Sequence, residues 1–233
     1  MRDSIPKLSK SRFMAGLQCH KRLYLESYAR ELADPVDPLT QAVLDAGSRI
    51  GAAARQRFAG GLLITEPHGE HEEAERKTRR ALAEPSLPVI YEAAFTSDDI
   101  RIRADILARS PQGPFDVVEV KSSASLRLEH EWDVAVQLRV LEGADVPIRS
   151  AFLMHLNRDY VHPGGDYDLE GLFTLADVTE TARARQKDVA SALAEMRAPL
   201  RSEAPPEIEV GAHCESWSSW RPADAPARRS ASR

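Results

Sequence analysis

Three short β-type runs in the middle of the chain, followed by a helix and a further strand, constrain the fold most strongly. The runs are Val89–Phe95, Ile100–Arg109 and Phe115–Lys121, and the turn-rich segments SDD and SPQGP separate them. Short turn-rich connections favour antiparallel pairing of the strands they join. A helical pattern over 129–142 and an apolar strand over Ile148–Leu156 follow. The order predicts an α/β fold with a central mixed sheet flanked by helices.

Helical patterns dominate the N-terminal part of the chain. Residues 9–28 predict one helix, whose apolar positions are Phe13, Leu17, Leu23 and Leu25. Residues 39–58 predict a second helix, whose inward candidates are Val43, Leu44, Ile50, Ala54 and Phe58. Leu62–Ile64 indicates a short strand, and the charged stretch 70–83 a solvated helix.

The patterns divide the chain into three parts. We expect an N-terminal helical segment over 1–60, a core over 61–200 that ends with an amphipathic helix over 178–197, and a tail over 201–233. The end of the tail is rich in Pro, Ala, Ser and Arg, a composition that predicts disorder over most of this part.

Length and composition narrow the class of protein. A chain of 233 residues with 42% hydrophobic and 29% charged residues is ordinary for one soluble domain. No apolar run reaches the ~18–20 residues of a membrane span, and the basic N-terminus lacks the apolar core of a secretory signal. We therefore expect a cytoplasmic protein without a membrane partner. The net charge of −5 argues against bulk electrostatic binding of nucleic acid, but an empty metal-binding cleft is itself acidic.

A carboxylate and an amine stand at one end of the run FDVVEVKSS. Side chains alternate across a strand, so Glu119 and Lys121 project from one face, roughly 6–7 Å apart. An E-x-K tripeptide alone is more often the charged face of an edge strand. Asp105 makes a functional site the better interpretation, because a hairpin through SPQGP would place it about 5 Å from Glu119 at the backbone. Two carboxylates this close favour a cation between them, and Mg²⁺ or Mn²⁺ suits hard oxygen ligands.

The alternative for Asp105 is an ion pair with Arg101 or Arg103 on an exposed face. Two further polar residues are candidates for the same site. Glu92, on the preceding strand, could add a third carboxylate, although such a residue alone is more often a surface glutamate. Gln137 lies near the apolar face of its helix, and it could reach the site or bond to a backbone group instead. The set predicts metal-assisted phosphodiester hydrolysis, with Lys121 stabilising developing negative charge or orienting the nucleophile.

Together these residues resemble the RecB-like branch of the PD-(D/E)XK nuclease superfamily, which includes CRISPR-associated RecB-type exonucleases. The resemblance covers most of residues 7–215 and includes the stretches KLSKSRFMAGLQCHKRLYLE, AGSRIGAAARQRFAGG, YEAAF, RADILAR, VVEVKSS and AVQLRVLEG. It implies a restriction-endonuclease-like core. It also implies that Asp105 and Glu119 bind metal, that Lys121 is catalytic, and that Gln137 and Glu92 match the family's glutamine and its acidic position before the aspartate.

The sequence departs from these relatives at two sites. Many relatives carry G-x-x-x-H in the helix before the core, where this chain has Gly47 and Gly51. Iron–sulfur relatives use four cysteines, whereas this chain has only Cys19 and Cys214, so a [4Fe–4S] cluster is not expected. A mixed site with His20 and His213 is a minor alternative, and we expect the other histidines, including His68 and His71, at the surface.

Two functions of different class follow from the resemblance and the departures. The first is a metal-dependent exonuclease that acts on nucleic acid, with DNA favoured over RNA. The second is a catalytically weakened nucleic-acid-binding or accessory module that retains the nuclease fold. A structural partner of a helicase or nuclease subunit is a third reading.

Overall fold

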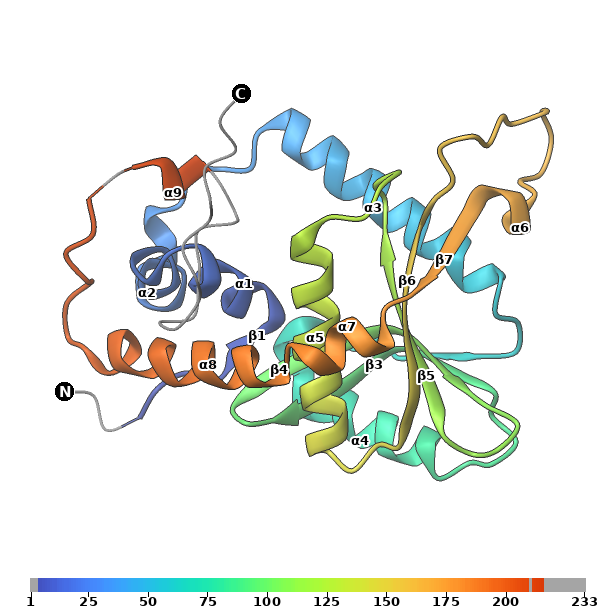
Figure 1. The fold of residues 1–233 in the computed structure, drawn as a ribbon, viewed down its shortest axis with the longest axis horizontal. Helices are drawn as coiled ribbons and strands as arrows, with labels where there is room; N and C mark the ends of the chain where they lie inside the picture. The colour runs from blue at the N-terminus through green and yellow to red at the C-terminus, as the bar shows by residue number, and fades with distance from the viewer. Residues whose placement is uncertain (1–3, 210, 216–233) are drawn as a thin grey trace.

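The computed structural model describes residues 4–209 and 211–215. Within them, seven strands form one mixed sheet in the order β2-β3-β4-β5-β6-β7, and β1 pairs with β4 (Figure 1). The strands are β1 Leu8–Ser9, β2 Leu62–Leu63, β3 Val89–Ser97, β4 Ile100–Arg109, β5 Phe115–Lys121, β6 Ile148–Leu156 and β7 Phe173–Asp177. The prediction of a mixed sheet flanked by helices is therefore confirmed.

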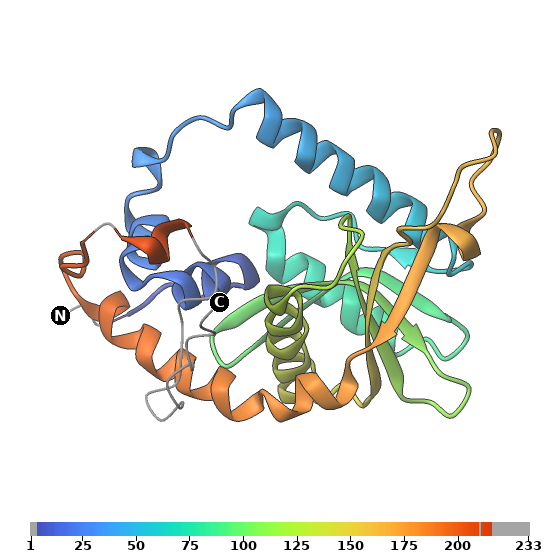
Figure 2. The same ribbon diagram turned by 45° about the horizontal axis from the view of Figure 1, so that its top comes forward.

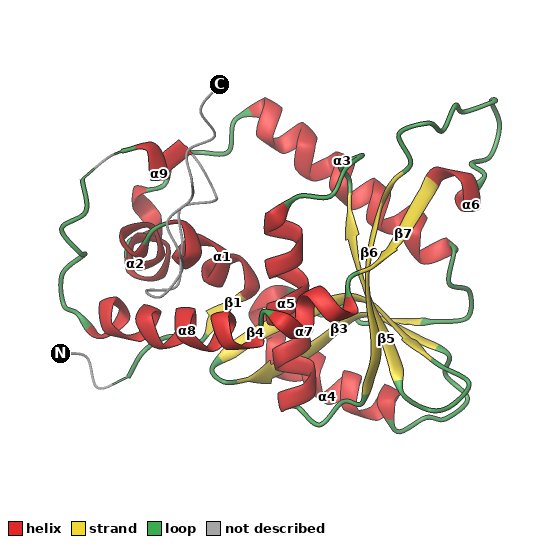
Figure 3. Ribbon diagram, viewed as in Figure 1, coloured by secondary structure: helices red, strands yellow, loops and turns green. Residues whose placement is uncertain are grey.

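Helices cover both faces of this sheet (Figure 3). The α-helices are α1 Lys10–Gln18, α2 His20–Tyr28, α3 Pro38–Gln56, α4 His71–Leu82, α5 Leu128–Gly143, α6 Leu169–Leu172, α7 Thr179–Ala184, α8 Gln186–Arg201 and α9 Ala212–Glu215, and the 3₁₀ helices are η1 Arg30–Leu32 and η2 His68–Glu70. The larger core lies between the sheet and α1, α2, α4, α5, α7 and α8. A smaller core lies between the sheet and the helices α3 and α6. None of the described helices has the length and apolarity needed to cross a membrane.

The predicted strands and their hairpins are confirmed. β3 and β4 are antiparallel, as are β4 and β5, while β5 and β6 are parallel. α5 connects the two parallel strands and packs against the sheet, which is the crossover that parallel pairing requires. Trp132, Val136, Val140 and Leu141 of α5 are buried and form its apolar face.

The prediction of single helices over 9–28 and 178–197 was wrong. Cys19 takes an extended conformation, with φ −163° and ψ 125°, and separates α1 from α2. Arg185 separates α7 from α8. α1 and α2 contact each other and both contact α8, so the break lets each helix bury its own apolar residues. A helical period of 3.6 continues across a one-residue break, and the sequence pattern therefore does not reveal it.

Two of the inward positions predicted for the helix 39–58 were also wrong. Val43 is 60% exposed and Leu44 is 54% exposed, whereas Ala54 is fully buried. Figure 2 shows the reason: the N-terminal half of α3 lies away from the sheet, and only its C-terminal half covers it. Ile50, Ala53 and Phe58 pack there against the smaller core.

The helix predicted as solvated over 70–83 instead buries one face. α4 carries Ala74, Thr78 and Ala81 against β3, and the Thr78 hydroxyl accepts a hydrogen bond from the Ala94 N–H. His71, expected at the surface, is buried, and its Nε2 lies 3.2 Å from the carbonyl oxygen of Phe95. The high charge of this helix hid a narrow apolar stripe. Of the predicted tail, residues 216–233 lie outside the described part of the chain.

We expect Gly61→Ala to destabilise the protein by about 1–3 kcal/mol, the usual range for overpacking a buried site. A methyl group at Gly61 would lie well inside van der Waals contact of the Tyr91 ring. Tyr91 is buried and donates its hydroxyl to the carbonyl oxygens of Arg55 and Phe58, so it attaches the end of α3 to the sheet. Gly69→Ala is the control, because no atom lies within 4 Å of a methyl group there. Equal urea midpoints for the two variants would contradict this account.

Candidate active site

Three carboxylates occupy one transverse row of the sheet. The register of β3 with β4 places Glu92 opposite Asp105, and the register of β4 with β5 places Glu119 opposite Asp105. Neither of these two pairs belongs to the regular β-ladder that the neighbouring residues of the same strands form. Instead, Asp105 Oδ2 accepts a hydrogen bond of 2.7 Å from the Val120 backbone N–H. The hairpin predicted from SPQGP therefore brings Asp105 beside Glu119, with a side-chain oxygen in place of a backbone acceptor.

At this row β3 and β4 also change register with respect to the two cores: positions two residues apart, which a regular strand would place on one face, lie in different cores. Tyr91 and Ile106 belong to the smaller core, whereas Ala93 and Ala104 belong to the larger one. Glu92 lies at the change, with φ 55°, in the left-handed region that costs a non-glycine residue of order 1–3 kcal/mol. Strict alternation along β4 ends at this row, so Ile106 does not share the face of Ile100 and Ile102, as simple strand alternation would have it.

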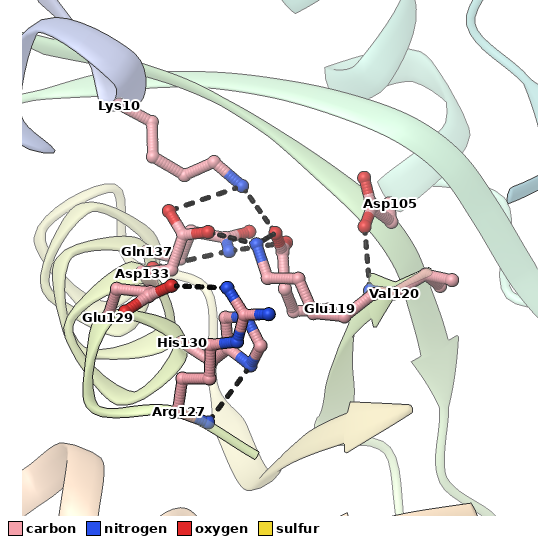
Figure 4. Close-up of polar contacts among 10 residues, drawn as sticks. Lys10, Asp105, Glu119, Val120, Arg127, Glu129, His130, Asp133 and Gln137 are labelled. Carbon is pink, nitrogen blue, oxygen red and sulfur yellow. Dashed lines mark hydrogen bonds and ion pairs between the residues drawn. The ribbon is translucent and has the colours of Figure 1, made fainter. Parts of the chain in front are cut away.

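Glu119 is the centre of the polar network (Figure 4). Its side chain is 3% exposed, and its Oε1 accepts from Lys121 Nζ and from Lys10 Nζ, both at 2.7 Å. Its Oε2 accepts from Gln137 Nε2 at 2.7 Å. Lys121 also forms an ion pair with Asp133. Gln137 was expected to reach either the site or a backbone group, and it does both, since Nε2 also lies 3.3 Å from the Asp133 carbonyl oxygen.

Sequence reasoning missed two members of this network, Asp133 and Lys10. Asp133 precedes Gln137 by four residues in α5, so the two share a helix face. Once Gln137 was a candidate, this spacing could have identified Asp133 as a second one. Lys10 Nζ lies 2.7 Å from Glu119 Oε1 and 3.6 Å from Asp133 Oδ1. No local pattern connects Lys10 to residues more than a hundred positions later.

The sheet topology explains how Lys10 reaches Glu119. β3 already pairs with Ile100 and Arg101 along one edge of β4, so β1, which pairs with the same two residues, lies along the other edge. That is the edge on which β5 pairs with Ile106 to Arg109. β4 and β5 thus separate beyond the Asp105 row, and β1 occupies the opening. Lys10 follows Ser9, whose side chain caps α1 by accepting from the Arg12 N–H.

Burial and neighbouring charges shift the pKa values of the two carboxylates, Asp105 and Glu119, in opposite directions. Burial and the neighbouring carboxylate of Glu119 raise the pKa of Asp105 to about 8. Burial also favours the neutral form of Glu119, but the ammonium groups of Lys10 and Lys121 outweigh it and hold its pKa well below the usual range. The carboxylates of Asp133 and Glu119 raise the pKa of both lysines despite their burial. Perturbed groups that face one another in a cleft are typical of functional sites.

The row of Glu92, Asp105 and Glu119 is named here the acidic row. Two clefts meet at two of its members, Glu92 and Asp105. The cleft under α3, of about 510 Å³, is lined by Gly47, Ser48, Gly51, Arg55, Glu92, Asp105, Ile106, Val120, Lys121 and Ser122. The second, of about 760 Å³, is named here the cationic cleft, and its charged lining consists of Lys7, Lys10, Arg12, Arg30, Arg101, Arg103, Glu26, Glu92 and Asp105. Six cations face three carboxylates there, although the chain is acidic overall. The buried Nε atoms of Arg101 and Arg103 have no partner among the described residues.

The acidic row offers some, but not all, of the ligands that a small divalent cation needs. Within the described residues, no three His, Cys, Asp or Glu side chains converge closely enough to hold a metal by themselves. Mg²⁺ commonly uses only one or two carboxylates and completes its shell with water and substrate phosphate. Asp105 and Glu119 supply such a pair. Gln137 is fully buried, and its Oε1 has no partner among the described residues, which suits a water on a cation as donor.

We expect Gly51→His to increase the affinity for Mn²⁺ about tenfold, or roughly 1.4 kcal/mol. Gly51 lines the same cleft as Asp105 and Glu92, and no atom lies within 4 Å of a side chain begun there. An imidazole there would add a nitrogen ligand to the carboxylates that line this cleft. Gly51→Ala is the matched control, since it also replaces a helical glycine but adds no ligand. Calorimetric titration that gives the two variants one affinity would contradict the prediction.

Cys19 and Cys214 lie apart from this site. Gln18, beside Cys19, donates its amide to the carbonyl oxygens of His213 and Cys214, which attaches α9 to the end of α1. Cys214 Sγ lies 3.5 Å from His213 Nε2, and both cysteines are free thiols. The described residues include no cluster of cysteine and histidine able to hold a metal.

Comparison with known proteins adds little to this geometry. No family model and no curated protein matches the chain. LHK-Exo in complex with dAMP superposes with 12% identity over 83% of this chain and 89% of its own, with a TM-score of 0.47. Alkaline exonuclease LHK-Exo from Laribacter hongkongensis gives 13% identity over 83% and 89% of the chains, with a TM-score of 0.36. SSO0001 gives 14% identity over 82% and 77%, with a TM-score of 0.36. Likeness this distant carries no argument about activity.

Proposed function

We propose that the protein is a divalent-metal-dependent nuclease that hydrolyses phosphodiester bonds of DNA. The observation that carries the proposal is that Asp105 lines both the cationic cleft and the cleft under α3, while the buried Glu119 beside it contacts Lys121, which lines the cleft under α3. The resemblance to the RecB-like branch of the PD-(D/E)XK superfamily supports the same roles for these three residues.

Each residue has a part that its contacts support. Asp105 and Glu119 would hold Mg²⁺ or Mn²⁺, which when bound polarises the phosphate and acidifies the attacking water. Lys121 lies against Glu119 and lines the cleft under α3, where its charge can stabilise the negative charge that develops on the phosphate. Gln137 holds Glu119 in one orientation through the bond to Oε2. The six cations of the cationic cleft would neutralise neighbouring phosphates.

One observation favours the second candidate, a catalytically weakened nucleic-acid-binding module. Lys10, Lys121 and Gln137 together engage both oxygens of Glu119. If these contacts persist when metal is offered, they fill both acceptor sites of Oε1 and one of Oε2, and little of the Glu119 carboxylate is left for a cation. The module would then bind nucleic acid through the cationic cleft without cleaving it.

A cleavage assay separates the two candidates. Purified protein is incubated with single-stranded DNA, duplex DNA and RNA, each with Mg²⁺, with Mn²⁺ or with EDTA. We expect cleavage of DNA with either metal and none with EDTA. Oligonucleotides labelled at the 5′ or the 3′ end distinguish stepwise shortening, as expected of an exonuclease, from internal cuts. Binding without cleavage under every metal condition would overturn the proposal and favour the binding module.

A further inference from the structure

Lys10 stands at the junction between the acidic row and the cationic cleft. Its ammonium group contacts Glu119 at 2.7 Å, and the same side chain lines the cationic cleft. The side chain is 22% exposed, so one side remains open to an incoming group. The pairing of β1 with β4 determines its place, which makes the contact a property of the fold and not of a mobile surface side chain.

Lys10 and Lys121 share one carboxylate oxygen but differ in their other contacts. Both donate to Glu119 Oε1. Lys121 has a second close partner in Asp133, whereas the Asp133 oxygen nearest to Lys10 is 3.6 Å away. Lys10 is therefore the less tightly held of the two. When a cation occupies Glu119 Oε1, Lys10 is the amine that is freer to turn toward the cationic cleft.

The charge balance of the site gives Lys10 two opposite effects. Glu92 is balanced by Arg55, whose guanidinium lies 3.8 Å from it. With a divalent cation bound, Asp105, Glu119 and Asp133 contribute three negative charges, and Lys10, Lys121 and the cation contribute four positive charges. The net charge of +1 attracts a phosphodiester group, which carries −1. Without Lys10 the net charge is zero, and the cation no longer competes with an amine for Glu119 Oε1.

We propose that Lys10 is a positioning residue that weakens metal binding at Glu119 and strengthens binding of the substrate phosphate. This inference rests on the proposed nuclease function and adds a residue to its site. A purely structural role, in which Lys10 only neutralises Glu119 and holds α1 to the sheet, predicts lower stability but no opposite change in the two affinities.

The test compares Lys10→Met, which removes the charge, with Lys10→Arg, which keeps it. Calorimetry measures Mn²⁺ affinity of the protein alone, and fluorescence anisotropy in Ca²⁺ measures the affinity for a labelled single-stranded oligonucleotide. Removing one charge at contact distance from a partly exposed site should alter each affinity by roughly fivefold to tenfold. Lys10→Met should bind Mn²⁺ more tightly and the oligonucleotide more weakly, and Lys10→Arg should resemble the wild type in both.

Lys7→Met is the matched control. Lys7 lines the same cleft but has no ion pair with any described residue. It should lose some oligonucleotide affinity and keep its Mn²⁺ affinity. If Lys10→Met does not fold, as judged by circular dichroism, Lys10→Gln takes its place, because it keeps a donor to Glu119 without the charge.

The outcomes for Lys10 and for the nuclease activity can be told apart. An unchanged or weaker Mn²⁺ affinity in the neutral variants, or an unchanged oligonucleotide affinity, overturns the role of Lys10 even if the wild type cleaves DNA. A wild type that binds Mn²⁺ and DNA without cleavage overturns the nuclease proposal, while opposite shifts in the two affinities would still support Lys10. A wild type that binds no Mn²⁺ overturns both.

Discussion

Asp105→Asn is expected to abolish DNA cleavage and at the same time to stabilise the metal-free protein. Asp105 is proposed as a metal ligand, and a bound metal contributes roughly several kcal/mol by stabilising the charge that develops on the phosphate, so its loss would bring cleavage to background. The amide oxygen of asparagine can still accept the hydrogen bond that Asp105 Oδ2 accepts from the Val120 N–H. The fold is therefore preserved while the charge is lost.

The gain in stability follows from the pKa of Asp105. Burial and Glu119 raise this pKa from 3.8 to about 8, so the folded, metal-free protein keeps a proton that the unfolded chain loses near pH 4. Because the native state binds more protons, its stability falls as pH rises through this window. Asparagine does not titrate, so the advantage of Asp105→Asn should grow between pH 5 and pH 8. A rise in Tm of about 2–4 °C, which corresponds to roughly 1 kcal/mol at this length, is expected near pH 8 in EDTA.

Asp116→Asn is the control for this experiment. Asp116 lies on the same strand as Glu119 but forms an ion pair with the half-exposed Arg149, away from the acidic row. It should keep full activity, with a change in stability within about 1 kcal/mol. A variant Asp105→Asn that retains cleavage would exclude Asp105 from the metal site. Equal stability of that variant and wild type at every pH would show that the carboxylate is not under electrostatic strain.

Glu119→Ala is expected to cause the largest loss of stability among the site variants, about 3–5 kcal/mol in EDTA. That is the usual cost of removing one partner from a buried ion pair. The change would leave the ammonium groups of Lys10 and Lys121 in a protected site with Asp133 as their close acidic neighbour. The amide of Gln137 would also lose its acceptor at 2.7 Å. Urea denaturation measures the free energy of unfolding directly.

Glu119→Gln separates loss of charge from loss of shape. The glutamine oxygen can still accept one hydrogen bond, so this variant should lose less stability than Glu119→Ala while losing cleavage completely. The metal-free stability of Glu119→Ala then reports on the network, and the activity of Glu119→Gln reports on the proposed metal ligand. A loss below about 1 kcal/mol in Glu119→Ala would mean that the two lysines are effectively solvated.

The central hairpins could be read from the sequence because their information is local. A run such as Ile100–Arg109 alternates apolar and polar residues, and the turn after it contains Pro and Gly, so its pairing with Phe115–Lys121 follows from neighbouring residues alone. The same local reasoning found Glu119 and Lys121, two residues apart on one strand. It failed where a short break occurs without a change of period, as at Cys19, and where a helix extends beyond the sheet it covers, as at Val43.

The amino-acid sequence by itself determined the mixed sheet, the order of its hairpins and the proximity of Asp105 to Glu119, since each depends on pairing between strands that follow one another along the chain. Only the tertiary structure decided that Lys10 reaches Glu119, that Asp133 joins them, and that six cations gather in one cleft. The physical reason is that β4 and β5 separate at the acidic row, and the opening is filled by β1, which lies about ninety positions before β4 in the chain. Which segment enters depends on how the whole chain packs, and no local pattern records it.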